Sequence, residues 1–236
     1  MTRLSQLLIE LGRLHPADPY FKEMAESTRQ IPEARSQIAT YNKTLQVLDL
    51  PSWSELKGKA LNAFMQVAPG RGRRAFFDQL NEAFAYRHLL QHGNLSVSFL
   101  PESKTAKSPD ISYINENKTC FCEVKTIHIS EEEIERFKSM EAYSNTIYLT
   151  LSEEFLTKLA STIKSAYSQV QARGEYGMVY AIVNFDDFTL SHYPTYRRQI
   201  TAHLRANFPN REVYLKVGIQ GRKHVHHNPP GKTQKS

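Results

Sequence analysis

Residues 109–125 read PDISYINENKTCFCEVK, and this stretch decides the fold that the sequence predicts. Two short runs rich in β-branched and aromatic residues, 111–114 and 119–124, flank a polar turn. Such runs around a polar turn are typical of an antiparallel β-hairpin. Asp110 therefore opens the hairpin, and Glu123 lies near its end.

Strand geometry gives the charged residues of this hairpin a chemical meaning. Side chains two positions apart on a strand point to the same face, so Glu123 and Lys125 share one face. Cys122 and Val124 point to the other. Asp110 approaches Glu123 if the start of the first strand pairs with the end of the second. Two carboxylates and the Val124 carbonyl suit a hard divalent cation that keeps several waters, which describes Mg²⁺, with Mn²⁺ as a substitute, better than Zn²⁺. Lys125 would orient the attacking water or help to deprotonate it.

The pair Pro109-Asp110, followed by Glu123-Val124-Lys125, resembles the PD-(D/E)xK signature of the restriction-endonuclease-like nuclease superfamily. The resemblance spans roughly residues 75 to 185. It implies an α/β fold, in which a mixed sheet flanked by helices has the element order αβββαβ. It also implies metal-dependent hydrolysis of phosphodiester bonds, with Asp110 and Glu123 as metal ligands and Lys125 beside them.

The helix predicted over residues 75–92 ends before Gly93 and is apolar on more than one side. Glu82 lies within this apolar surface, where burial of an unpaired carboxylate is costly. Many members of the superfamily carry a glutamate on the helix before the sheet, and Glu82 is the match. It would reach the metal directly or through water. Asp78 is the less favoured substitute, and an exposed, solubilising Glu82 is the alternative reading.

The rest of the chain is expected to form a helical extension over residues 1–70, a nuclease-like domain over 71–220 and a mobile basic tail over 221–236. Nothing in the sequence orders the histidines of that tail. In the extension, a turn over 49–52 precedes a helix capped by Ser52 or Ser54. Further strands are expected over 95–100, 178–183 and 212–219, and further helices over 152–173 and 196–207.

The chain has 30 Lys and Arg against 24 Asp and Glu, a formal net charge of +6 that favours an anionic partner. The basic run at 71–74 is either a phosphate contact or a solvated loop. Lysine or glutamine on the helix after the hairpin is often near the active site in related folds. The candidate nucleic-acid contacts are Arg71, Arg73, Arg74, Lys104, Lys107, Lys164 and Gln169.

The sequence carries no apolar run near the roughly 20 residues that a membrane helix needs, and no secretory signal is apparent. Cys120 and Cys122 lie on one strand face and are expected to be reduced thiols. We therefore expect a cytoplasmic protein without a membrane partner.

These observations predict a nuclease whose favoured substrate is DNA and not RNA. Endonuclease action is preferred by analogy with the fold. A homodimer is left open. The alternative is a catalytically inactive nucleic-acid-binding or assembly module with the same fold. A small-molecule enzyme with a Mg²⁺ carboxylate site is a third hypothesis, weakened because no glycine-rich phosphate loop is present.

Overall fold

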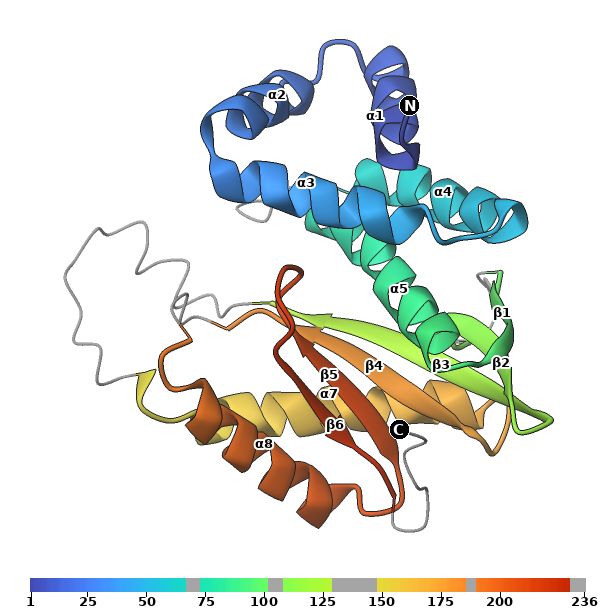
Figure 1. Cartoon of the computed structure of the whole chain (residues 1–236), viewed down its shortest axis with the longest axis vertical. Coiled ribbons are helices and arrows are strands. Elements are labelled where there is room, and N and C mark those ends of the chain that lie inside the picture. The colour runs from blue at the N-terminus through green and yellow to red at the C-terminus, as the bar shows by residue number, and fades with distance from the viewer. Residues whose placement is uncertain (67–72, 102–107, 129–147, 186–189, 230–236) are drawn as a thin grey trace. The chain divides into compact units, whose positions relative to one another are not determined.

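The computed structural model describes residues 1–66, 73–101, 108–128, 148–185 and 190–229. Within them the chain is α/β, with seven helices and a six-stranded mixed sheet of strand order β1-β2-β3-β4-β5-β6 (Figure 1). The strands are β1 (Leu95–Phe99), β2 (Ile111–Asn115), β3 (Lys118–Ile127), β4 (Gly177–Val183), β5 (Glu212–Val217) and β6 (His224–His227). In this part of the chain no helix has the length and apolarity that crossing a bilayer requires.

The chain divides into two compact units. Unit 1 comprises Met1–Glu102 and Asp110–Lys118, and unit 2 comprises Ser103–Pro109 and Thr119–Ser236. The helix and the first strands that the sequence assigns to a nuclease-like domain beginning at residue 71 therefore fall in unit 1, together with the N-terminal helices.

The helices of unit 1 begin and end largely where prolines and capping residues predict. They are α1 (Arg3–Leu14), α2 (Tyr20–Gln30), α3 (Pro32–Leu45), α4 (Leu50–Phe64) and α5 (Arg74–Gln91). The cap predicted for α4 is wrong, because the Asp49 side chain accepts a hydrogen bond from the Ser52 backbone N–H at 2.7 Å. Pro51 is tolerated in the first turn, where its missing N–H has no intrahelical acceptor.

Aromatic packing explains why α5 belongs with the N-terminal helices. Phe64 at the end of α4 and Phe76 in the first turns of α5 are fully buried, and their rings meet edge to face with centroids 5.5 Å apart. Tyr41 of α3 is also fully buried and packs against Phe84 of α5. Burial of large rings is a main source of folding free energy, so α3, α4 and α5 share one core.

The strand pair β1 and β2 completes unit 1. The two strands are antiparallel, with Phe99 opposite Ile111. After β2, Glu116 and Asn117 both have positive φ, at 49° and 62°. Two successive left-handed residues define the type I′ turn that suits the twist of a hairpin. The turn predicted between the two strands of the motif is thus present.

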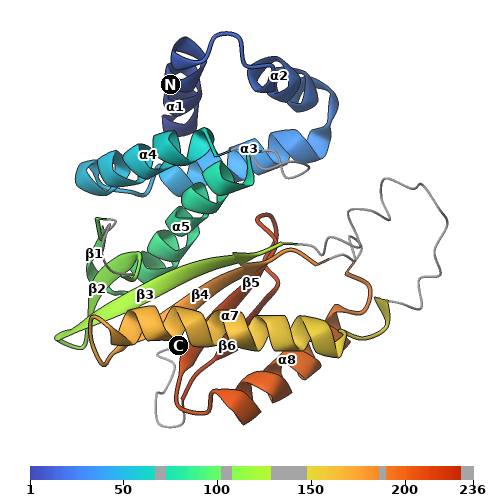
Figure 2. The ribbon, with the colours of Figure 1, turned by 180° about the vertical axis from the view of Figure 1, so that it is seen from behind.

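In unit 2, β3, β4 and β5 run parallel, and β6 returns antiparallel to β5. Two helices, α7 (Glu153–Gln171) and α8 (Tyr193–Asn207), complete the unit (Figure 2). The buried core joins Val179 and Ala181 of β4 to Ile163 of α7 and Ile200 of α8. The face of the sheet that carries Val179 and Ala181 is therefore the helix-covered face.

The prediction that the chain is a mobile tail from residue 221 is wrong for residues 224–227, which form β6. Val225 enters the core of unit 2, and the His227 Nε2 atom lies 2.9 Å from the Phe208 carbonyl oxygen. Because strand side chains alternate, Val225 and His227 share the buried face, while His224 and His226 lie on the other. Pairing with β5 supplies the order that the isolated sequence lacks.

Gly177 opens β4 at a close approach to β3. A Cβ atom at this position would overlap the Phe121 carbonyl oxygen and lie 2.8 Å from Val170 Cγ1. We expect Gly177→Ala to lower the free energy of unfolding by about 1–3 kcal/mol, because a backbone neighbour has to move. Urea unfolding measures the change.

Gly58→Ala is the matched control for this prediction, since Gly58 lies inside α4 and a Cβ atom added there would have no neighbour within 4 Å. Alanine is the better helix former, so this variant is expected to gain about 0.5–1 kcal/mol. Equal stabilities of the two variants would contradict the tight contact between β3 and β4.

Candidate functional site

Two of the three charged residues of the motif, Glu123 and Lys125, lie on β3 in unit 2. In the parallel register Glu123 is opposite Val179, and Lys125 is opposite Ala181. Aligned residues of neighbouring strands point to the same face. Glu123 and Lys125 therefore share the helix-covered face of the sheet, as the spacing of two residues predicts.

Glu123 and Lys125 form a close ion pair. The Lys125 Nζ atom donates a hydrogen bond to Glu123 Oε1 at 2.5 Å. Only 2% of the Glu123 side chain is exposed, against 32% of the Lys125 side chain. A buried carboxylate needs compensation, and the ammonium group supplies it. The pair thus places a negative group inside unit 2 and extends to solvent through the lysine.

The neighbouring residues of β3 follow the expected alternation. Cys122 is fully buried, and Val124 is buried between the two charged positions in sequence. Cys120 and Cys122 are both buried, and neither is part of a disulfide. No disulfide therefore constrains this strand among the residues that the structure describes.

Glu82 lies in unit 1, in the middle of α5, and it is 4% exposed. Its Oε2 atom accepts a hydrogen bond from Nζ of Lys59, which lies on α4 and is 6% exposed, at 3.1 Å. The alternative of an exposed glutamate is therefore wrong. Asp78, one turn earlier, is only partly buried. Glu82, which the sequence places within an apolar helix surface, is thus paired with the buried ammonium group of Lys59.

Lys59 was not singled out by sequence, although a signal was present. It follows Leu56 by three positions and precedes Ala63 by four, so it lies on the buried stripe of α4. A lysine on such a stripe indicates a buried acidic partner, because a lone ammonium is rarely buried. The sequence does not say which acid that is.

A second buried polar contact adjoins this ion pair on α5. The Tyr41 hydroxyl of α3 donates a hydrogen bond to Asn81 Oδ1 at 2.8 Å. Burial, with a smaller contribution from the charge of Asp78, raises the pKa of Tyr41 far above its ordinary value. Two consecutive polar residues of α5, Asn81 and Glu82, are thus held by α3 and α4.

Asp110 immediately precedes β2 in unit 1 and is partly buried. Its carbonyl oxygen accepts a hydrogen bond from the Leu100 backbone N–H at 2.8 Å, which extends the ladder between β1 and β2. Asp110 and Glu82 thus belong to unit 1, whereas Glu123 and Lys125 belong to unit 2. Across the described ranges, no three His, Cys, Asp or Glu side chains form a group that could hold a metal ion.

Arg73 is corrected from an expected phosphate contact to a structural residue. Its guanidinium pairs with Asp18, donates to the Phe64 carbonyl oxygen and lies 4.0 Å above the Phe64 ring centroid. A guanidinium held by an acid, a carbonyl and a ring is not presented to a phosphate. A basic sequence run does not reveal such contacts.

The other predicted nucleic-acid contacts vary in exposure. Lys164 is exposed on α7, and Gln169 on the same helix is partly buried. Arg74 is partly buried in the first turn of α5. Arg71, Lys104 and Lys107 lie outside the described residues.

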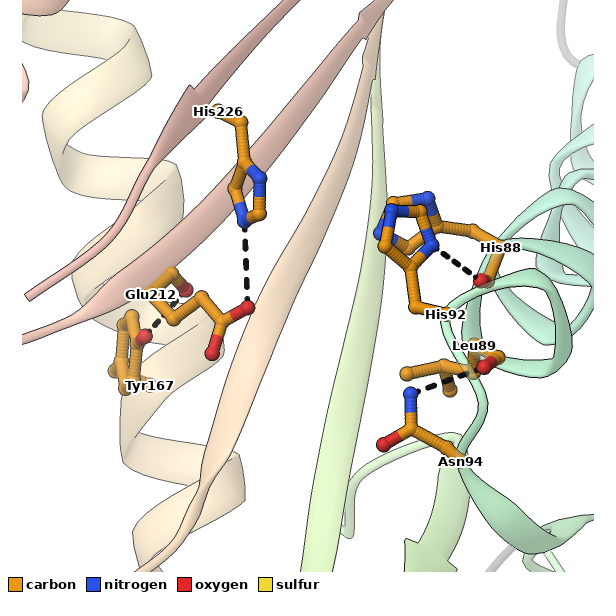
Figure 3. Close-up of polar contacts among 7 residues, drawn as sticks. All are labelled: His88, Leu89, His92, Asn94, Tyr167, Glu212 and His226. Carbon is orange, nitrogen blue, oxygen red and sulfur yellow. Dashed lines mark hydrogen bonds and ion pairs between the residues drawn. The ribbon is translucent and has the colours of Figure 1, made fainter. Parts of the chain in front are cut away.

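Some polar contacts at the ends of helices and strands, in both units, were not predicted from the sequence (Figure 3). In unit 1, the Asn94 side chain donates to the Leu89 carbonyl oxygen at 2.9 Å, beyond the end of α5. In unit 2, the Tyr167 hydroxyl donates to the Glu212 carbonyl oxygen at 2.5 Å. His226 Nε2 lies 3.3 Å from Glu212 Oε1. The two contacts of Glu212 therefore link α7 and β6 to the start of β5.

No protein-family model, no curated protein and no solved structure matches the chain.

Proposed function

We propose that the chain is a metal-dependent nuclease with a restriction-endonuclease-like core, which hydrolyses phosphodiester bonds of DNA as an endonuclease. The observation that carries the proposal is the contact of 2.5 Å between Lys125 Nζ and the buried Glu123 carboxylate on β3. The described elements α5, β1, β2, β3, α7 and β4 follow the order αβββαβ, which supports the same class.

The donor set has the chemistry of a Mg²⁺ site, with Mn²⁺ as a substitute. On β3 of unit 2, the Glu123 carboxylate and the Val124 carbonyl would hold the ion. Asp110 and Glu82 of unit 1 are the further carboxylates that the resemblance assigns to it. All are oxygen donors, which hard cations prefer. When bound, the ion supplies activation of water and stabilisation of the charge that gathers on the phosphate.

Lys125 contributes chemistry of its own. Its ammonium group is a hydrogen-bond donor that orients a water molecule, and its positive charge offsets negative charge on a phosphate oxygen. Contact with the buried Glu123 carboxylate fixes the position of this group. Its exposure of 32% leaves the lysine accessible to a substrate.

DNA is the proposed substrate because the formal net charge of +6 favours a polyanion. Lys164, exposed on α7, is the described candidate for a phosphate contact. RNA has the same backbone charge and is the less favoured substrate.

Cleavage assays test the proposal. Plasmid, linear and single-stranded DNA are incubated with Mg²⁺, Mn²⁺ or EDTA, and nicks and breaks are quantified. We expect cleavage only with metal, and its loss in Asp110→Asn and Glu123→Gln. Glu175→Gln, at an exposed acid of unit 2, is the matched control and should cleave like the original chain. Cleavage in EDTA, or full activity of either motif variant, would contradict the proposal.

The second candidate function is a catalytically inactive nucleic-acid-binding or assembly module. It is favoured by one observation: Glu123 and Glu82 are each paired with a lysine, Lys125 and Lys59. Such pairs also serve as structural ion pairs. DNA binding that is unaffected by EDTA, without cleavage of any substrate, would favour this module.

A further inference from the structure

A ladder of three rings crosses β4, β5 and β6 in unit 2. Tyr180 and Tyr214 stack with centroids 5.1 Å apart and planes 16° apart. Tyr214 and His224 stack with centroids 5.2 Å apart and planes 13° apart. Tyr180 is buried, Tyr214 partly buried and His224 exposed. Because β6 is the last strand of the sheet, the ladder ends in an exposed ring at the sheet edge.

The last ring of the ladder is held in place by its surroundings. His224 Nδ1 lies 3.0 Å from the Arg222 carbonyl oxygen, and the Tyr193 hydroxyl donates to the His224 carbonyl oxygen at 2.8 Å. Tyr214 supports one face of the ring. A ring that is already fixed loses little conformational entropy when a flat ligand stacks on it.

Basic residues adjoin this ring in sequence and across the strand pair. Arg222 and Lys223 are exposed and directly precede His224. Lys223 Nζ lies 5.2 Å from the Tyr193 ring centroid, and Lys216, opposite His224 on β5, donates to the Gly221 carbonyl oxygen at 3.0 Å. The acid of this strand pair, Glu212, faces His226 (Figure 3). Three basic residues, Arg222, Lys223 and Lys216, thus adjoin the exposed ring in sequence or in strand register.

The ladder is separate from the Glu123 and Lys125 pair. Tyr180 and Tyr214 alternate with Val179 and Val213, which belong to the helix-covered core. Glu123 is aligned with Val179, so it points to the face opposite the ladder. The ring at His224 is therefore a second feature of unit 2.

We propose that the His224 end of the ladder is a stacking site for an unpaired nucleotide of a nucleic-acid strand. The base stacks on the imidazole ring, and Arg222 and Lys223 attract its phosphate. Aromatic rings beside cations bind single strands in this way, since every base has a flat face. Bases of a duplex are covered by their neighbours, so the site selects single strands. Cleavage chemistry is not required.

Fluorescence anisotropy of the full chain in EDTA tests the site without cleavage. The probes are a labelled single-stranded oligonucleotide, its duplex and the same strand with abasic positions. We expect the single strand to bind most tightly and the abasic strand to lose affinity. His224→Ala is expected to weaken single-strand binding about tenfold, and His224→Phe to retain it, because phenylalanine keeps the ring face.

Charge variants provide the second arm. Arg222→Ala is expected to reduce the salt dependence of single-strand binding, whereas Arg205→Ala, at an exposed arginine of α8, leaves it unchanged. Thermal melts check that each variant is folded. The proposal is overturned if His224→Ala binds like the original chain, if His224→Phe is as weak as His224→Ala, if duplex binds equally well, or if AMP competes as effectively as the strand. If the chain never cleaves DNA but shows the expected binding pattern, the nuclease proposal is refuted and the stacking site is not.

Discussion

Replacing Lys125 with methionine is expected to lower the rate of the proposed metal-dependent DNA cleavage by about 10²- to 10³-fold, the usual cost of removing one donor that stabilises developing negative charge. Methionine keeps most of the length and volume of lysine but removes the group that contacts Glu123 Oε1 at 2.5 Å. Single-turnover rates at saturating DNA separate this loss from any change in binding.

Two further variants make the Lys125 result specific. Lys158→Met removes an exposed lysine from α7 in the same unit and should leave the rate unchanged. Lys125→Arg keeps the charge and should recover part of the rate. Since Lys125→Met also removes the partner of a buried carboxylate, urea unfolding of each variant must accompany the kinetics. A folded Lys125→Met that cleaves at the original rate would refute the catalytic assignment.

Lys59→Met is expected to lower the free energy of unfolding by about 3–5 kcal/mol, the usual cost of removing one partner from a buried ion pair. Lys59 and Glu82 are 6% and 4% exposed, and their side chains are 3.1 Å apart. The substitution leaves the Glu82 carboxylate without this partner inside the helical core. Denaturant unfolding followed by circular dichroism measures the change.

The double variant Lys59→Met with Glu82→Leu is expected to recover most of this loss, because apolar residues of similar volume replace a buried pair well. Lys57→Met is the control on the same helix. Lys57 pairs with Glu10 at 2.5 Å, but both side chains are partly exposed, so the change should stay below about 1 kcal/mol. If Lys59→Met is no more costly than Lys57→Met, the buried pair contributes little to folding.

Local sequence signals were sufficient to predict most of the helices and strands. Prolines at positions 16 and 32 separate the first helices, Gly93 follows α5, and the runs around the turn at Glu116 and Asn117 form the predicted strands. These signals act through the backbone of a few neighbouring residues, so one sequence reveals them. The strand β6 depends on pairing with β5 and on burial of Val225, which are contacts made only after folding.

The same distinction applies to the candidate site. A spacing of two on a strand predicted that Glu123 and Lys125 share a face, and they form a contact. An apolar helix predicted that Glu82 is buried, but its contact with Lys59 joins two helices, and periodicity does not identify which residues meet. Arg73 was misread because its contacts with Asp18 and Phe64 are likewise tertiary.

Unit 1 is discontinuous in sequence, because β1 ends at Phe99 and its partner β2 begins at Ile111, after Ser103–Pro109 of unit 2. During synthesis, a nascent chain that has emerged only to residue 102 exposes the backbone edge of β1 without its native neighbour. Exposed strand edges are where wrong pairings begin. The N-terminal helices therefore complete their unit only once residue 118 has left the ribosome.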